Sequence, residues 1–289
     1  MDKPVIGFIG TGVMGCSMAG HLIDASYELN VYNRTKEKCE PLTRKGAKLC
    51  ASPAEVAAAS DVVITIIGFP KDVEEVYLSR GGLVESARGG ALLMDMTTSS
   101  PSLAVKIYDA ARARGGVKAC DAPVTGGDRG AREAKLSILF GGDEEDFERA
   151  LPILKIMGKN IARFGGAGSG QTAKLANQTV IAGTMLGVCE GLAYAKRAGI
   201  DPKELLSCIE NGAAGSWSLS NYGPRILDGD FNPGFFVKHF VKDMKLVSES
   251  AKSLGMSLPG LETALARYQK LAERGGEENG TQGLYKLYE

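Results

Sequence analysis

The feature that most constrains the fold of this chain is a glycine-rich turn close to its beginning. Residues 5–9 form an apolar run typical of a buried strand, and residues 16–24 have the pattern of a helix. The turn between them has the pattern G-x-G-x-x-G and reads Gly10-Thr11-Gly12-Val13-Met14-Gly15. In strand–turn–helix order this pattern is typical of a dinucleotide-binding site. By itself it also fits an ordinary turn between a strand and a helix.

Each glycine of the turn has a physical role in a dinucleotide site. Gly10 permits a tight turn, Gly12 lets the backbone approach a pyrophosphate, and Gly15 lets the helix pack close to the strand. The following helix offers backbone N–H groups to the phosphates. We therefore predict that residues 10–15 bind the phosphates of a dinucleotide.

The composition excludes several classes of partner. Of the 289 residues, 44% are hydrophobic and 24% charged, and 34 Lys and Arg balance 34 Asp and Glu. This balance predicts no nucleic-acid or anionic-membrane partner. No apolar run is long enough to span a bilayer, and the N-terminus lacks a signal-peptide pattern, so we expect a cytoplasmic protein. Six scattered cysteines and two distant histidines predict neither disulfides nor a metal site.

The first half of the chain alternates short apolar strands with helical segments. Strands are predicted at residues 5–9, 28–32, 48–50, 62–67, 92–95, 117–120, 137–140 and 161–164. Helices are predicted at 53–59, with Ser52 as the N-cap, and at 102–114. Pro41 predicts that the second helical segment starts late or kinks. The alternation favours an α/β fold with a doubly wound, mainly parallel sheet.

The pattern changes at the glycine-rich residues 165–170, after which no strand is predicted. Residues 171–198 resemble one long buried helix. Four further segments have helical periodicity, at 201–211, 219–227, 237–254 and 258–273. We therefore predict an α/β domain at residues 1–164. An all-helical domain at 165–289 would begin with a long interdomain helix.

The end of the second predicted strand indicates which dinucleotide binds. An acid at this point would bond the adenosine ribose hydroxyls, but the sequence has Asn33-Arg34-Thr35. An arginine there can hold a 2′-phosphate through two parallel hydrogen bonds. The segment therefore favours NADP(H) over NAD(H). The alternative is a plain turn with Thr35 as the N-cap of the next helix.

Loops at the carboxyl ends of parallel strands form the ligand crevice of open α/β sheets. Thr98 lies in one such loop, and Phe69-Pro70 lies in another, where it would cover the dinucleotide. A third loop contains Thr125-Gly126-Gly127, whose hydroxyl and backbone N–H groups suit a carboxylate. Helix capping and a plain turn are nearly equal alternatives for these loops.

The start of the long predicted helix has the most specific cluster of polar residues. Lys174 lies in its first turns, and Asn177 and Gln178 follow three and four residues later, on one helix face. A lysine on a buried helix is costly unless it has a purpose, and general acid–base chemistry is one such purpose. The alternative is a lysine whose charge reaches solvent or an ion-pair partner.

Four segments together resemble the signature blocks of the β-hydroxyacid dehydrogenase family. They are residues 7–15, 121–127, 165–178 and Lys242-Asp243, in the family's order and across essentially the whole chain. The family includes 3-hydroxyisobutyrate dehydrogenases, tartronate semialdehyde reductases and glyoxylate/succinic semialdehyde reductases. The resemblance implies a Rossmann-type N-terminal domain, a helical C-terminal domain and a cleft at their junction.

The resemblance also implies roles for individual residues. Lys174 would be the catalytic acid or base, with Asn177 as its partner. The substrate would be held by Thr125, Gly126 and Gly127, with Trp217 and Phe236 lining the cleft, while Thr98 and Lys242 would contact the cofactor. Two residues depart from the family pattern: Thr125 replaces the usual serine, and Gln178 replaces a second asparagine. Lys174 itself distinguishes the chain from related imine reductases, which lack this lysine.

The resulting expectation is a hydride transfer between NADP(H) and a small β-hydroxyacid or the matching semialdehyde. We expect a homodimer or homotetramer, because the small residues of the long helix suit close packing and the resemblance favours such assemblies. Two alternatives are a non-catalytic NADP-binding scaffold and a decarboxylating phosphosugar-acid dehydrogenase. The second would need a longer helical domain and a cluster of basic residues.

Overall fold

The computed structural model describes residues 3–289, and the chain folds as two compact units. The first unit is Met1–Lys174 and the second is Leu175–Glu289. The division lies inside one long helix, α9 (Ser169–Arg197), ten residues beyond the boundary expected at 164–165. Each unit has its own hydrophobic core.

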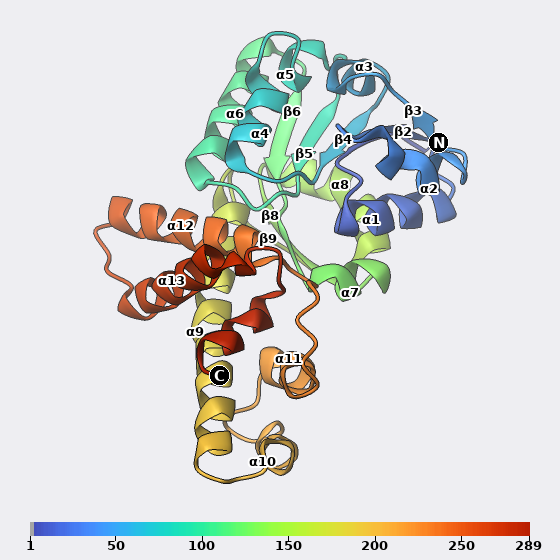
Figure 1. The fold of residues 1–289 in the computed structure, drawn as a ribbon. Helices are drawn as coiled ribbons and strands as arrows, with labels where there is room; N and C mark the ends of the chain where they lie inside the picture. Colours follow the sequence, from blue (N-terminus) through green and yellow to red (C-terminus); the bar gives the residue numbers. More distant parts are fainter. Residues whose placement is uncertain (1–2) are drawn as a thin grey trace. The chain divides into compact units, whose positions relative to one another are not determined.

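The first unit is built on one nine-stranded sheet (Figure 1). Its strands are β1 (Ile6–Ile9), β2 (Leu29–Tyr32), β3 (Lys48–Leu49), β4 (Val62–Thr65), β5 (Leu92–Asp95), β6 (Lys118–Asp121), β7 (Val124–Thr125), β8 (Leu136–Gly141) and β9 (Gly158–Gly165). The order is β3-β2-β1-β4-β5-β6-β8-β7, with β9 paired to β8. The pairs from β3 to β6 are parallel, whereas β8 runs antiparallel to β6 and β7. The predicted doubly wound, mainly parallel sheet is therefore confirmed.

Alternate side chains of the central strands enter two different cores. Ile6 and Phe8 of β1 belong to one core and Ile9 to the other, and in β5 Leu92 and Leu93 are divided in the same way. Successive side chains of a strand point to opposite faces, so helices must cover both faces of this sheet. These helices are α1 (Val13–Asp24), α2 (Glu40–Thr43), α3 (Pro53–Ala58), α4 (Pro70–Leu78), α5 (Leu83–Ser86), α6 (Pro101–Arg114), α7 (Gly127–Arg132) and α8 (Glu144–Met157).

Several helices of the first unit start at residues that the sequence pattern indicates. Ser52 caps α3 by accepting a hydrogen bond from Glu55 N–H, and Ser100 caps α6 in the same way. Pro41 lies in the first turn of the short α2, which follows a 3₁₀ turn, η1 (Lys36–Cys39), so the predicted late start is correct. Thr35 is the N-cap residue of η1, as the alternative interpretation expected. Its backbone is extended and its side chain makes no capping hydrogen bond.

The second unit is helical, as predicted. After α9 it contains α10 (Pro202–Ile209), α11 (Trp217–Leu227), α12 (Val237–Ser253), α13 (Pro259–Leu271), a π-helical stretch η2 (Ala272–Gly276) and a 3₁₀ stretch η3 (Thr281–Leu287). Within the described residues no strand follows β9, and the extended pairing there is an isolated bridge between Phe236 and Gly280. None of the helices in residues 3–289 is both long and apolar enough to cross a membrane.

Candidate active site

Two positions of the glycine-rich turn between β1 and α1 have no space for a side chain. Gly10 has a φ of +97°, and a side-chain Cβ there would collide with the Ile66 carbonyl oxygen. A Cβ on Gly15 would collide with the carbonyl oxygen of Gly10. Both positions therefore exclude larger residues because protein backbone already occupies the space.

Gly12 lacks a side chain for a different reason. Its φ of −74° suits any residue, and among the described residues no heavy atom beyond its immediate chain neighbours and the adjoining helix backbone lies within 4 Å of its Cβ position. Gly12 is also the N-cap of α1, and no side chain caps this helix. The open space beside uncapped N–H groups fits an anionic group such as a pyrophosphate. The residues of the turn therefore fit the phosphates of the predicted dinucleotide cofactor.

The end of β2 is bonded to this turn through Asn33. Its Oδ1 accepts a hydrogen bond of 3.2 Å from Thr11 N–H, and its Nδ2 donates to the carbonyl oxygen of Thr35 at 2.9 Å. The neighbouring Arg34 has a side chain that is 79% exposed. The structure therefore brings the turn and the predicted phosphate-binding arginine to adjacent positions.

Arg34 has an ion-pair partner that the sequence analysis missed. Its Nη1 lies 3.1 Å from Oδ1 of Asp72, whose Oδ2 accepts a hydrogen bond of 3.1 Å from Phe69 N–H. Asp72 thus connects Arg34 to the loop before α4, which contains Phe69 and ends at Pro70. An acid at the third position of a helix that begins with proline was the available signal for this capping bond.

Hydrogen bonds join the loops after β4 and β5. Asp95 Oδ1 accepts hydrogen bonds from the Thr65 hydroxyl at 2.8 Å and from Thr97 N–H at 3.0 Å. The Thr97 hydroxyl oxygen in turn accepts a bond from Ile67 N–H at 3.0 Å. Thr98, the predicted cofactor contact, is the next residue of this ordered loop.

Asp121, at the end of β6, anchors the first turn of α9. Its Oδ1 accepts a hydrogen bond from Gly168 N–H, and its Oδ2 accepts one from Gln171 N–H, both at 2.7 Å. Burial raises the pKa of the Asp121 carboxyl from 3.8 to about 6, although these two N–H groups oppose the change. This role of Asp121 was not predicted from the sequence, because its partners lie 47 and 50 residues away along the chain.

Gln171 links the same helical turn to the loop after β5. Its Oε1 accepts a hydrogen bond of 2.8 Å from Ser99 N–H, and its Nε2 donates one of 2.7 Å to the carbonyl oxygen of Thr97. The side chain is fully buried. Nothing in a single sequence connects residue 171 to residues 97 and 99, so this link was also missed.

Lys174 lies one helical turn beyond Gln171 and is 6% exposed. It is therefore a buried lysine on a turn that Asp121 and Gln171 attach to the carboxyl ends of β5 and β6. Burying an ammonium group is costly unless polar or charged groups surround it, so a lysine at this position constrains its neighbours.

The predicted carboxylate-binding segment lies between β7 and α7. Thr125 ends β7, where it pairs with Ser137 of β8, so the structure adds a short strand that the sequence analysis read as a loop. Gly126 and Gly127 follow with φ values of +129° and +62°. Such backbone is unfavourable for residues with side chains.

Four polar residues of the second unit form one connected group. Asn177 Nδ2 donates to Gln178 Oε1 at 2.8 Å, and Gln178 Nε2 donates to Asp243 Oδ2 at 2.6 Å. Lys242 Nζ lies 2.8 Å from Asp243 Oδ1. Gln178, which departs from the family pattern, therefore bonds directly to the predicted partner of Lys174.

The two predicted cleft aromatics differ in their surroundings. Trp217 begins α11 with 54% of its surface exposed and lies edge-on to Tyr222, with ring centroids 5.3 Å apart. Phe236 is the N-cap residue of α12 and lies edge-on to His239, with Lys238 Nζ 5.0 Å from its ring centroid.

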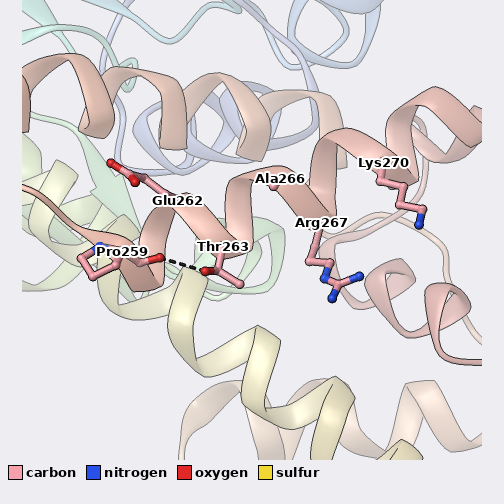
Figure 2. Close-up of a pocket in the computed structure, with 6 residues that line it drawn as sticks. All are labelled: Pro259, Glu262, Thr263, Ala266, Arg267 and Lys270. Carbon is pink, nitrogen blue, oxygen red and sulfur yellow. Dashed lines mark hydrogen bonds between the residues drawn. The ribbon is translucent and has the colours of Figure 1, made fainter.

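Figure 2 shows an open groove along α13, lined by Pro259, Glu262, Thr263, Ala266, Arg267 and Lys270. None of the predicted site residues lines this groove. In residues 3–289 no group of three or more histidine, cysteine or acidic side chains is arranged to hold a metal ion.

Comparison with known proteins identifies relatives across both units. Residues 5–166 match the family model of the NAD-binding domain of 6-phosphogluconate dehydrogenase. Residues 168–288 match the model described as the NAD-binding domain of NADP-dependent 3-hydroxyisobutyrate dehydrogenase. The two matches meet just before α9.

The individual relatives align over almost the full chain. An uncharacterised oxidoreductase of Bacillus subtilis is 51% identical over 99% of both chains. A probable 3-hydroxyisobutyrate dehydrogenase-like protein of Arabidopsis thaliana, described as mitochondrial, is 50% identical over 96% of this chain and 83% of its own. The solved structure of Mycobacterium tuberculosis 3-hydroxyisobutyrate dehydrogenase with L-serine has a TM-score of 0.89 and 27% identity, covering 99% of both chains.

Proposed function

This chain belongs to the β-hydroxyacid dehydrogenase family, and we propose that it transfers a hydride between NADP(H) and a small β-hydroxyacid or the matching semialdehyde. Family membership makes it an NAD(P)-dependent oxidoreductase. The choice of cofactor, the acid–base residue and the substrate are the parts that we propose.

The observation that carries the proposal is the buried position of Lys174. Its side chain is 6% exposed, and its helical turn is anchored by Asp121 and Gln171 at the strand ends where a dinucleotide fold binds its ligands. A cation that is costly to bury and is held on a rigid support fits a group that exchanges a proton with substrate.

In the proposed reaction the lysine handles the proton and the cofactor handles the hydride. NADPH, when bound, supplies the hydride to the carbonyl carbon of the substrate. Lys174 Nζ gives a proton to the carbonyl oxygen, which becomes the hydroxyl group. In the oxidative direction neutral Lys174 takes the hydroxyl proton as the hydride leaves. Asn177, three residues further along α9, would orient the lysine or the substrate oxygen.

The preference for NADP(H) is supported by the end of β2. Asn33 there is bonded to the glycine-rich turn, no carboxylate stands at this position, and the exposed Arg34 follows. The family model matched by the second unit also describes an NADP-dependent enzyme. Gly10, Gly12 and Gly15, with Thr11, Val13 and Met14, would hold the pyrophosphate, and Phe69, Pro70, Thr98 and Lys242 would contact the rest of the cofactor.

The substrate class is supported by the Thr125-Gly126-Gly127 segment. Its hydroxyl and the backbone N–H groups of two glycines with positive φ suit a carboxylate. The mycobacterial relative was solved with L-serine, which is itself a β-hydroxyacid. Trp217 and Phe236 would line the rest of the substrate pocket.

We further propose that the protein is a cytoplasmic homodimer or homotetramer. The support is a row of glycines on α9, at 183, 187 and 191, flanked by Val180 and Tyr194, which are 69% and 74% exposed. Light scattering on the purified protein tests the assembly, and a monomeric mass would contradict it.

Oxidation of NADPH, followed at 340 nm, tests the activity with succinic semialdehyde, glyoxylate and tartronate semialdehyde as substrates. Lys174→Ala is expected to lower kcat by about 10²–10⁴-fold while leaving NADPH binding nearly unchanged. Lys196→Ala, an exposed lysine near the end of the same helix, is the matched control and should keep wild-type kcat.

Three results would contradict the proposal. Retention of more than about a tenth of wild-type kcat by Lys174→Ala would remove the lysine from the mechanism. NADPH binding without turnover of any short hydroxyacid or semialdehyde would favour a non-catalytic scaffold. Release of carbon dioxide from a phosphosugar acid would favour the decarboxylating alternative.

A further inference from the structure

The fully buried side chain of Gln171 bonds to both neighbours of Thr98. Its amide oxygen accepts from Ser99 N–H at 2.8 Å, and its amide nitrogen donates to the Thr97 carbonyl oxygen at 2.7 Å. The structure therefore places one side chain between the loop of Thr98 and the helical turn that precedes Lys174.

We propose that Gln171 is a positioning residue that holds Lys174 in register with the Thr97–Ser99 loop. This inference rests on the proposed function, in which Lys174 transfers the proton and Thr98 contacts the cofactor. Hydride and proton must reach two adjacent atoms of one substrate. The loop that contacts the cofactor and the helical turn that carries Lys174 must therefore keep a fixed separation.

A glutamine side chain satisfies both partners at this position. The Ser99 N–H group requires an acceptor and the Thr97 carbonyl requires a donor, and a carboxamide provides one of each. Glutamate has no donor when ionised, methionine has neither function at useful strength, and asparagine is one methylene shorter. Two bonds from one planar group also fix its rotation, which a single hydrogen bond would not do.

Asp121 fixes the same turn from the other side. It binds the N–H groups of Gly168 and Gln171, each at 2.7 Å. A Cβ on Gly170 would collide with the Leu139 carbonyl oxygen, and a Cβ on Gly141 would come too close to the Asp121 carboxylate. Asp121 and the close backbone contacts of Gly170 and Gly141 therefore fix the start of α9. Gln171 connects the same turn to the loop after β5.

The proposal predicts a defect in catalysis that exceeds the defect in folding. Gln171→Met keeps the length of the side chain but removes both hydrogen bonds. We expect kcat to fall by about 10- to 100-fold, because a displacement of about 1 Å at a reacting group has a cost of this size. Urea unfolding of the same protein measures the loss of stability.

Asn30→Leu is the matched control. Asn30 is also a buried carboxamide, and its Nδ2 donates to the Ala59 carbonyl oxygen at 3.2 Å and to Ser60 Oγ at 3.1 Å. These bonds join β2 to the residues that precede the amino end of β4, whereas the candidate site lies at the carboxyl ends of the strands. Asn30→Leu should lower stability while kcat changes by less than about twofold.

A double variant separates positioning from a purely structural role. If Gln171 acts through Lys174, Gln171→Met should lower kcat in the wild-type background but not the residual rate of Lys174→Ala. If Gln171→Met does not fold, Gln171→Glu replaces it, because glutamate keeps the acceptor for Ser99 N–H and loses only the donor to Thr97. We expect the glutamate variant to lose kcat by at least about fivefold.

The outcomes distinguish this inference from the proposed function. Full activity of Lys174→Ala would overturn the proposed function itself. An inactive Lys174→Ala together with a kcat for Gln171→Met equal to that of Asn30→Leu would overturn only the positioning role. An equal loss from Gln171→Met in both backgrounds would also overturn it, because Gln171 would then act independently of Lys174.

Discussion

Asp72 Oδ1 lies 3.1 Å from Nη1 of Arg34, so the arginine proposed to bind a 2′-phosphate is already paired with a carboxylate. The Arg34 side chain is 79% exposed, and ion pairs of this kind contribute only about 0–1 kcal/mol. The pair therefore orients Arg34 without preventing it from turning toward a phosphate. It also places a negative charge close to where a second one would bind.

The first prediction concerns the effect of Arg34 and Asp72 on the preference for NADPH over NADH. Arg34→Asp should raise KM for NADPH at least about tenfold more than KM for NADH, because it replaces a charge-assisted contact with repulsion. Asp72→Asn should act in the opposite direction and lower KM for NADPH by a few-fold. Steady-state kinetics with both cofactors provides the measurement, and equal effects on the two cofactors would refute the role of Arg34.

The second prediction separates two glycines of the same turn. Gly12→Ala should leave the free energy of unfolding nearly unchanged, since its Cβ has open space and its φ is −74°. It should weaken NADPH binding by more than tenfold, because the methyl group would occupy the place of a phosphate.

Gly15→Ala is the matched comparison for that variant. Its Cβ would collide with the Gly10 carbonyl oxygen, so we expect a loss of stability of about 1–3 kcal/mol. Urea unfolding and NADPH fluorescence titration measure both quantities. A Gly12→Ala protein that binds NADPH normally would show that no phosphate lies there.

The third prediction concerns pH. Burial raises the pKa of Asp121 to about 6, so between pH 4 and 6 the folded protein binds more protons at this group than the unfolded chain. The contribution of Asp121 to the free energy of unfolding should therefore fall as pH rises through this range, by about 1–3 kcal/mol.

Comparison with Asp121→Asn isolates this effect. The difference in free energy of unfolding between wild type and Asp121→Asn, measured in urea at pH 4, 5, 6 and 7, should decrease with rising pH. An increase would mean that the hydrogen bonds from Gly168 and Gln171 outweigh burial, and that the carboxyl pKa is lowered.

The fourth prediction concerns the polar group of the second unit. Gln178→Leu removes the donor to Asp243 Oδ2 and leaves this oxygen buried, since Asp243 has no exposed surface. We expect a loss of about 1–3 kcal/mol in stability. In a thermal or urea melt, the double variant Gln178→Leu/Asp243→Leu should lose less stability than the sum of the two single variants, because both remove the same hydrogen bond, although Asp243→Leu also removes the ion-pair partner of Lys242. Additive losses would indicate that the two side chains do not depend on each other.

Local sequence patterns were enough to predict most of the fold. The alternation of apolar strands and helices identified the parallel sheet, and Ser52 and Ser100 act as caps because their partners lie three residues away. The two-residue strand β7 was missed because Val124 and Thr125 are too few to show a period. Thr35 occupies the N-cap position of η1, although its side chain makes no capping hydrogen bond.

The candidate site was predictable in its residue types but not in its supports. Lys174 and the three glycines stand out because their chemistry is unusual for their local structure. Asp121, Gln171 and Asp72 form bonds to residues that are far away in sequence, such as the 47-residue separation between Asp121 and Gly168. A single sequence does not contain such pairings, since they arise only when the strands align.

The bonds that Gln171 makes to the main chain also bear on how this enzyme could diverge or be redesigned. Its partners Ser99 and Thr97 contribute only backbone groups, so substitutions in their side chains leave the bond to α9 intact. Residues proposed to shape the pocket, such as Trp217, can then be exchanged while the proposed proton donor, Lys174, keeps its place. A positioning role for Gln171 would thus allow the substrate range to change without a change at position 171.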